Sequence, residues 1–213
     1  MKYQVILFRL FLGFIFCLNV FLLFGIRKER EDLENSMLIL RSLNDSIDQL
    51  NSRHNSWLLN YSITYHYQSL KIDGNHVLFD EKSNRINLLQ LSEKGPILIF
   101  KYSALNCNVC VDEQISLLKK AAKDIGPGNI TILTDYNTER ELYQFIRMNQ
   151  IDLQVFNSRN IELTEIDKSI PYYFILDNSY TLKLLFIPVT GDSLLTQQYF
   201  KKITERFFKK SFY

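Results

Sequence analysis

Three hydrophobic patterns follow one another along the chain. An apolar run without charged residues, LFLGFIFCLNVFLLFGI, covers residues 10–26. Apolar residues then recur at three- and four-residue spacings, which is typical of a helix with one apolar face; they are Leu33, Met37, Leu40, Ile47 and Leu50. From about residue 69, short apolar runs alternate with amphipathic segments. We therefore expect a transmembrane anchor over 1–27, a helical stalk over 28–60 and an α/β domain over 69–213.

The apolar run approaches the length needed to cross the hydrocarbon core of a bilayer, and Asn19 is its one strongly polar residue. We expect an uncleaved helix rather than a cleaved signal peptide, because no small-x-small cleavage site follows the run. Basic residues flank both ends almost equally, so charge leaves the orientation open. Cys17 lacks the small-residue context of a lipidation site and is expected to be an apolar filler.

The stalk pattern allows two interpretations. Two copies of the chain could pair along it as a short coiled-coil homodimer, in which Asn44 and Asn51 would set the register. Alternatively, the apolar stripe could pack on the chain's own domain. The sequence favours neither interpretation over the other.

Strands alternate with helices in the pattern of the domain. The runs HVLF at 76–79 and RINLL at 85–89 predict a hairpin, because turn-forming residues separate them. A buried strand, ILIFKY, ends before the cysteines, a helix follows them, and Lys101 in that strand is expected to point outward. Thr138 is the expected N-cap of the next helix. The later strands are NITILTD, DLQVF, PYYFILD and TLKLLFIP, and a helix over 194–208 completes a mixed sheet covered on both faces.

Composition narrows the classes of function. The formal net charge of +2 gives no electrostatic reason to expect a nucleic-acid partner. Three cysteines, at 17, 107 and 110, cannot form the disulfide framework of a small secreted scaffold, so a local pair is the only plausible bridge within the chain. The three histidines show no ligand spacing, and we expect neither a metal site nor a cofactor.

Four features occur in an order that a known family shares. They are a strand that ends just before a CxxC pair, the pair Cys107 and Cys110 opening a helix, Glu113 three residues after the second cysteine, and Ile170-Pro171 at the start of a later strand. With these features, about the last two-thirds of the chain resembles the TlpA-like branch of the thioredoxin superfamily, which includes membrane-tethered disulfide reductases. The resemblance implies an α/β fold of the thioredoxin-like type.

The chemistry expected of the pair is dithiol/disulfide exchange. A helix N-terminus stabilises a thiolate, so we expect Cys107 to attack a partner disulfide and Cys110 to resolve the mixed disulfide. The resemblance implies that Pro171 has a cis peptide bond and leaves the backbone of Ile170 free to pair with a substrate. For Glu113 two roles stay open: a proton acceptor for Cys110, or a carboxylate that interacts with the helix dipole.

These expectations describe a membrane-anchored thiol-disulfide oxidoreductase. Its partners would be protein disulfide or dithiol substrates and a redox partner protein. A CxxC domain tethered to a membrane makes most sense on the oxidising side, so we expect a single-pass protein of the cell membrane with its domain on the extracytoplasmic, periplasmic side.

Other functions remain as alternatives. A peroxiredoxin-like peroxidase needs Thr or Ser three residues before its reactive cysteine, but Ala104 stands there, one place after Ser103. A copper chaperone of this fold would need a histidine after the cysteines, and none follows His76. A non-enzymatic signalling or assembly factor with a structural CxxC is the third alternative. Ser103, Asn106 and Val109 replace residues usual in the family, which leaves redox potential and substrate preference open.

Overall fold

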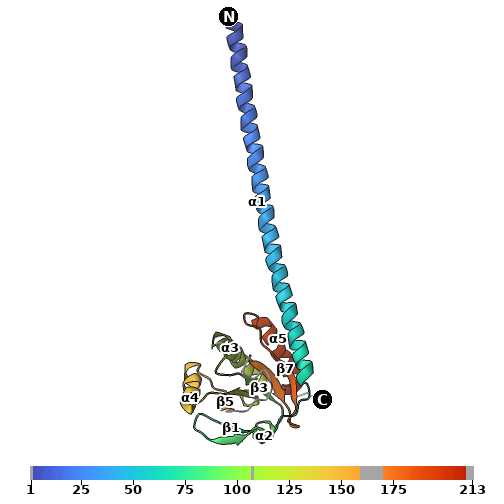
Figure 1. Cartoon of the computed structure of the whole chain (residues 1–213), viewed down its shortest axis with the longest axis vertical. Coiled ribbons are helices and arrows are strands. Elements are labelled where there is room, and N and C mark those ends of the chain that lie inside the picture. The colour runs from blue at the N-terminus through green and yellow to red at the C-terminus, as the bar shows by residue number, and fades with distance from the viewer. Residues whose placement is uncertain (1, 107, 159–169, 210–213) are drawn as a thin grey trace. The chain divides into compact units, whose positions relative to one another are not determined.

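Figure 1 shows the computed structural model of the chain, which forms two compact units, Met1–Asn55 and Ser56–Tyr213. The structure describes residues 2–106, 108–158 and 170–209, with the backbone alone at 2, 4–11, 17 and 108. Cys107, the expected attacking cysteine, lies outside the described residues, and so does its predicted role.

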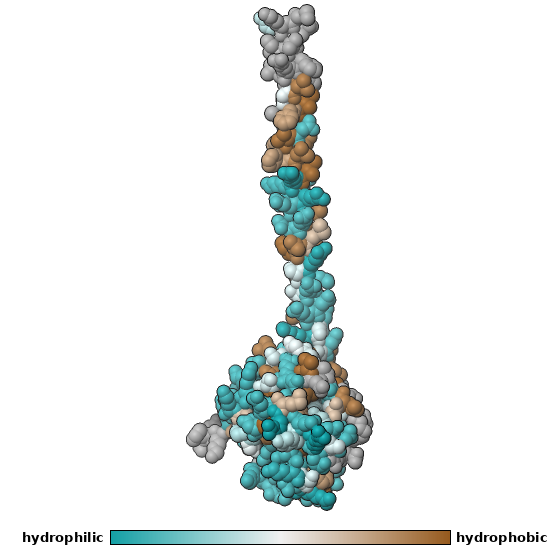
Figure 2. Space-filling view, turned by 90° about the vertical axis from the view of Figure 1, so that its left-hand side faces the viewer, coloured by the Kyte–Doolittle hydropathy of each residue, from teal (hydrophilic) through white to brown (hydrophobic). Residues whose placement is uncertain are grey.

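The first unit is part of α1, which runs from Lys2 to Tyr67, so the expected anchor and stalk residues share one continuous helix. Large apolar side chains are exposed along residues 12–26, where Figure 2 colours the helix mainly brown. Over the residues that the structure describes, no helix is both long enough and apolar enough to cross a membrane. The expected transmembrane helix is therefore not confirmed, and three side chains of its apolar run, at 10, 11 and 17, lie outside the description.

The second unit is built on a seven-stranded mixed sheet, counted over its described residues, with the order β2-β1-β5-β4-β3-β6-β7. β3, β4 and β5 are parallel, whereas β6 and β7 run antiparallel to their neighbours, and β1 is antiparallel to both β2 and β5. The strands are β1 (Val77–Phe79), β2 (Arg85–Asn87), β3 (Ile97–Lys101), β4 (Ile130–Thr134), β5 (Gln154–Asn157), β6 (Tyr172–Leu176) and β7 (Leu182–Phe186).

The helices of the domain are α2 (Leu88–Ser92), α3 (Asn108–Ile125), α4 (Glu139–Met148) and α5 (Ser193–Ile203), with a 3-10 turn at Pro127–Asn129 and a π turn at Thr204–Phe208. Three of them, α3, α4 and α5, lie close to where the pattern predicts them, whereas α2 was not predicted. Leu88 and Leu89, expected in a strand, begin this helix, because Gln90 accepts a hydrogen bond of 2.8 Å from Asn87 N and caps it. Thr138 caps α4 as expected: its hydroxyl accepts a hydrogen bond of 3.2 Å from Glu141 N, and the Glu141 side chain accepts one of 3.1 Å from Thr138 N. Such a capping box satisfies two backbone donors that the helix leaves without partners.

Alternation along β3 divides the core into two layers. Leu98, Phe100 and Tyr102 belong to the layer covered by α3, α4 and α5, and Ile97 and Ile99 belong to the layer that includes residues of α2 and the end of α1. Because a strand points successive side chains to opposite faces, a strand buried on both faces must be apolar throughout. The expected α/β fold, with a mixed sheet flanked by helices, is confirmed.

Lys101 is the charged exception in this strand. Only 1% of it is exposed, so the expectation that it points outward is wrong. The physical reason is the position of β3, which lies between β4 and β6 in the middle of the sheet and has no solvent-facing side. Lys101 is in register with Leu133 and Tyr172.

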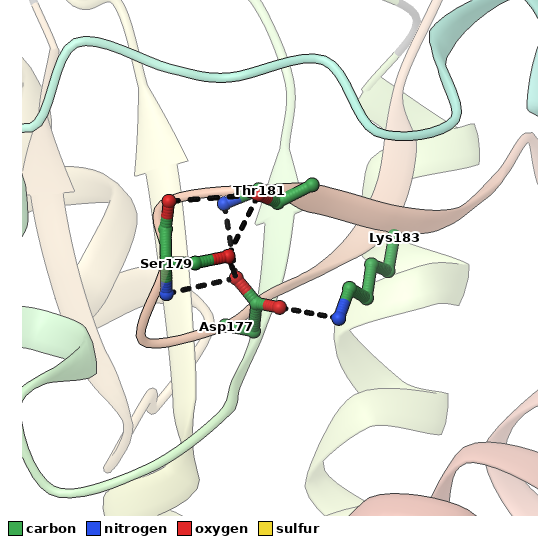
Figure 3. Close-up of polar contacts among 4 residues, drawn as sticks. All are labelled: Asp177, Ser179, Thr181 and Lys183. Atoms are coloured by element: carbon green, nitrogen blue, oxygen red, sulfur yellow. Dashed lines mark hydrogen bonds and ion pairs between the residues drawn. The ribbon is translucent and has the colours of Figure 1, made fainter.

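A network of hydrogen bonds around Asp177 holds the turn between β6 and β7 (Figure 3). Its Oδ1 accepts hydrogen bonds from the backbone N–H groups of Ser179 and Thr181 and from the Ser179 hydroxyl, at 2.7–3.0 Å. Its Oδ2 forms an ion pair with Lys183 on β7. Next to the turn Leu176 pairs with Leu182 and Ile175 with Lys183, and the register shifts before Tyr173 pairs with Phe186. The loop that follows β7 reaches the candidate site.

Candidate active site

Cys110 lies in the first turn of α3, directly after the loop that leaves β3. It is half-buried and forms part of the wall of a pocket of about 180 Å³. Three segments far apart in the sequence line this pocket: Asn106, Cys110 and Gln114; Ile170 and Pro171; and Ile187, Pro188 and Thr190. The structure therefore brings together three of the residues expected at the site, the second cysteine and the Ile170-Pro171 pair.

Pro171 stands where expected but not in the expected conformation. It directly precedes β6, whose first residue, Tyr172, is in register with Lys101 at the end of β3. None of the described peptide bonds is cis, so the Ile170–Pro171 bond is trans and the expectation of a cis bond is wrong. The trans form is the ordinary state of an X–Pro bond, and a proline at the start of a strand needs no cis bond to be accommodated.

Glu113 is engaged with the loop after β7. Its Oε2 accepts a hydrogen bond of 3.4 Å from the backbone N–H of Gly191. Gly191 has a φ of 78°, a left-handed conformation that glycine adopts without strain. The carboxylate thus links α3 to this loop, and neither of the two chemical roles expected for it is tested by this contact.

Thr190 is a site residue that the sequence analysis missed. Its hydroxyl donates a hydrogen bond of 3.3 Å to the sulfur of Cys110, from a position 80 residues further along the chain. The available signal was weak: a threonine followed by Gly191 and Asp192, between the last strand and the last helix. Such a loop could have been predicted to turn sharply, but not to turn towards α3.

The loop before the cysteines is held by Asp135, the residue after β4. Its Oδ2 accepts a hydrogen bond of 2.8 Å from the Ser103 hydroxyl, and its Oδ1 accepts one of 2.6 Å from Ala104 N. Within the loop, Asn106 Oδ1 accepts a hydrogen bond of 2.7 Å from Ser103 N. Ser103 and Asn106, which depart from the family pattern, therefore form a polar turn that delivers the chain to α3.

Two buried phenols, Tyr173 on β6 and Tyr102 directly after β3, stay neutral. Burial raises the pKa of Tyr173 well above its ordinary value, with smaller contributions from Tyr199 and Glu113, and its hydroxyl lies 3.3 Å from the side-chain oxygen of Gln114. Burial likewise raises the pKa of Tyr102, whose hydroxyl lies 3.3 Å from that of Tyr136. Because a protonated phenol is a donor, Tyr173 can orient the buried Gln114 at the back of the pocket.

Comparison with solved structures finds similar chains. A thiol:disulfide interchange protein from Bacteroides sp. is 14% identical, and the match covers 67% of this chain and 93% of that one with a TM-score of 0.48. The peroxidoxin BcpB from Mycobacterium tuberculosis is 14% identical, and the match covers 66% of this chain and 96% of that one with a TM-score of 0.49. Neither a protein-family model nor a curated protein matches this chain.

The topology of the second unit decides its class. Parallel β5, β4 and β3 continue into antiparallel β6 and β7, helices pack on both faces, Cys110 lies in the first turn after β3, and Pro171 precedes β6. The fold is thioredoxin-like. In this thioredoxin-like domain the described side chains hold no group of three His, Cys, Asp or Glu residues placed to bind a metal ion.

Proposed function

We propose that this chain is a thiol-disulfide oxidoreductase that exchanges disulfides with protein substrates through Cys107 and Cys110. One observation carries the proposal: the Cys110 sulfur lies in the first turn of α3, at a pocket shared with Ile170 and Pro171. A resolving cysteine needs a fixed position near the start of a helix, and a protein substrate needs a neighbouring surface on which to lie. The pocket supplies both features in one place.

The proposed reaction conserves atoms and electrons in two steps. The Cys107 thiolate attacks one sulfur of a substrate disulfide, forms a mixed disulfide and releases the first substrate thiolate. The Cys110 thiolate then attacks the Cys107 sulfur and releases the second. The substrate gains two electrons and two protons, and the chain is left with a Cys107–Cys110 disulfide. A redox partner protein with a dithiol must restore the reduced pair, and the same steps in reverse would oxidise a substrate.

We also propose that the N-terminal segment holds the domain at a membrane, with the domain on the extracytoplasmic side. The support is the uncharged run over residues 10–26 and the exposed apolar side chains along 12–26. Fractionation tests this: the chain should stay with membranes through alkaline carbonate washing and be released by detergent. Release by carbonate alone would contradict the proposal. Pairing of two copies through residues 28–60 stays a prediction.

Trapping tests the exchange reaction. In a Cys110→Ser chain, the mixed disulfide at Cys107 cannot be resolved. Disulfide-linked complexes with other proteins, which dithiothreitol cleaves, should therefore accumulate in cells. The matched control is Cys107→Ser/Cys110→Ser, which should form none. If the single variant gives no more complexes than the double variant, the CxxC pair does not exchange disulfides with proteins, and a structural role for it becomes the better explanation.

A further inference from the structure

The end of α1 is bonded to the outer edge of the sheet. β7 is the last strand of the sheet, and on its outer edge Leu182 exchanges backbone hydrogen bonds with Ser69 and Leu70, while no described strand pairs with this edge further along. Two polar side chains of α1 bond to this edge. The Thr64 hydroxyl donates to Leu185 O, and the Asn60 amide donates a hydrogen bond of 2.9 Å to Ile187 O while its oxygen accepts one of 2.5 Å from Ile187 N.

Asn60 therefore fixes both backbone groups of one residue. Its amide group presents a donor and an acceptor side by side, as a neighbouring strand would. Asn60 is 9% exposed and Ile187 is 6% exposed, so water does not easily replace either bond. Asn60 holds the loop that follows β7 at its first residue.

The remainder of this loop is short and is held at its other end too. Pro188 restricts its own backbone, and Asp192 N donates a hydrogen bond of 3.0 Å to Val189 O. Asp192 also caps α5, because its side chain accepts a hydrogen bond of 3.3 Å from Leu195 N. The loop therefore has little freedom to move between Ile187 and α5.

The tip of the same loop touches α3. The Thr190 hydroxyl donates to the Cys110 sulfur at 3.3 Å, and Gly191 N donates to Glu113 Oε2 at 3.4 Å. A series of hydrogen-bonded and covalently linked residues thus runs from α1 to the cysteine: Asn60, Ile187, Pro188, Val189, Thr190 and Cys110.

We propose that Asn60 of α1 is a positioning residue for Cys110: it fixes the loop after β7 so that the Thr190 hydroxyl donates to the Cys110 sulfur and stabilises its thiolate. The inference rests on the proposed function for its meaning, since the Cys110 thiolate is the group that would resolve the mixed disulfide. The effect of Asn60 and Thr190 on the pKa of Cys110 can be measured whether or not the chain exchanges disulfides. The helix that carries the N-terminal segment is thereby part of the redox site rather than a tether alone.

The Thr190 hydroxyl matters for the stability of the Cys110 thiolate because of the charges around the pocket. Among the described residues that line the pocket, none carries a charge. Of the titratable side chains packed around it, Glu113 on α3 bonds to Gly191, and Tyr173 on β6 lies beneath Gln114. Glu113 disfavours a nearby thiolate by its negative charge, and Tyr173 is neutral. A donor at the sulfur opposes the effect of Glu113.

The test measures Cys110 alone. In the full chain with Cys17→Ser and Cys107→Ser, held in detergent micelles, Cys110 is the only cysteine, and its rate of alkylation by iodoacetamide against pH gives its pKa. Thr190→Val keeps the shape of the side chain but removes the donor, so the pKa should rise and alkylation at pH 7 should slow by about three- to tenfold. Thr190→Ser, which restores a hydroxyl, should recover most of the rate.

Asn60 is tested against a matched residue of the same helix. Asn60→Ala should raise the pKa of Cys110 in the same direction as Thr190→Val, whereas Thr64→Val, which removes the bond to Leu185 O, should leave it unchanged. Melting temperatures of both variants show any general loosening. If Asn60 acts through Thr190, Asn60→Ala/Thr190→Val should match Thr190→Val alone.

Three results would overturn the inference: an unchanged pKa of Cys110 in Thr190→Val, an unchanged pKa in Asn60→Ala, or independent, additive shifts from Asn60 and Thr190. Because Cys107 is absent from the test chain, the outcome does not depend on disulfide exchange. A normal Thr190 effect together with failed trapping in Cys110→Ser would remove the proposed function and leave this linkage standing. Successful trapping with an unchanged pKa in Thr190→Val would support the proposed function and remove the linkage from Asn60 through Thr190 to Cys110.

Discussion

The hydroxyl of Ser103 donates a hydrogen bond of 2.8 Å to Oδ2 of Asp135, and this bond joins the loop before the cysteines to the end of β4. We expect Asp135→Ala to lower the free energy of unfolding by about 1–3 kcal/mol, because Ser103 is buried and loses its acceptor. The rate of reduction of a protein disulfide such as insulin should also fall, because the loop leads directly into the CxxC pair. Urea unfolding and an insulin turbidity assay measure the two effects.

Controls separate the loss of this bond from the loss of a charge. Asp135→Asn keeps an oxygen that can accept from Ala104 N and should lose less activity than Asp135→Ala. Asp152, an exposed residue just before β5, provides the reference substitution Asp152→Ala, which should change neither quantity. Equal behaviour of Asp135→Ala and Asp152→Ala would show that the loop does not depend on Asp135.

The lowered pKa of Asp177, in the turn between β6 and β7, predicts how the free energy of unfolding depends on pH. Partial burial alone would raise the pKa of Asp177, but hydrogen bonds from Lys183, Ser179 and Thr181 outweigh it and lower the pKa to about 2. A carboxyl whose folded pKa is depressed stabilises the fold above its unfolded pKa and loses that contribution as pH falls through the folded value. Asp177 should therefore contribute fully above about pH 4 and hardly at all below about pH 2.

Asp177→Asn measures this contribution. Near neutral pH the variant should be less stable than the parent chain by about 1–2 kcal/mol, a range reduced because Lys183 is partly exposed to solvent. The gap should close as pH falls from about 4 to about 2, since the parent then loses the same interaction. Urea unfolding at several pH values gives both curves. A gap that stays constant down to pH 2 would show that the carboxylate charge does not stabilise the turn.

Gly191 supplies a prediction at the loop that contacts α3. Its φ of 78° is strained for residues with a Cβ, so Gly191→Ala should lower the free energy of unfolding by about 1 kcal/mol. Gly191→Asn should cost less, because asparagine tolerates the left-handed region better than alanine. Apart from the adjoining residues of the chain, no described atom lies within 4 Å of an added Cβ, so contact with other segments does not contribute. Equal stability of the alanine and asparagine variants would contradict the backbone explanation.

The local features of the sequence predicted most of the fold. The apolar run of β3, the Thr138 cap and the amphipathic α3 depend on short-range patterns, and each appears where the pattern places it. The burial of Lys101 was missed, because a single charged residue in a strand does not reveal whether that strand lies at the edge or in the centre. The sequence predicted the position of Pro171 but not its trans peptide bond.

The candidate site was predictable only in part, because several of its contacts join distant segments. Cys110, Ile170 and Pro171 were identified from a motif and an order of elements, and the pocket brings them together. Thr190 and Asn60 act through bonds that span 80 and 127 residues, and no local pattern distinguishes them from other polar residues. Such residues can be identified only from the folded structure, in which the loop after β7 lies beside α3.

Two exposed apolar side chains in the sequence around the cysteines yield a prediction on substrate preference, given the proposed function. Leu105 is 81% exposed and Val109 is 74% exposed, on either side of Cys107 in the sequence. Apolar side chains in such positions favour contact with another protein surface. We expect Leu105→Asp and Val109→Asp to slow reduction of a protein disulfide by about tenfold, which corresponds to about 1.4 kcal/mol of lost transition-state binding.

Comparison with a small disulfide substrate shows whether the substitutions weaken contact with a protein substrate or change the reactivity of the cysteine sulfur. Reduction of oxidised glutathione should change far less in these variants than reduction of insulin, because a small substrate reaches the sulfur without covering Leu105 or Val109. Val77→Asp is the matched control: Val77 is 39% exposed on β1 and does not line the Cys110 pocket, so its replacement should affect neither substrate. If Leu105→Asp and Val109→Asp slow both substrates equally, the aspartates act on thiolate formation through their charge, and the apolar residues do not select proteins.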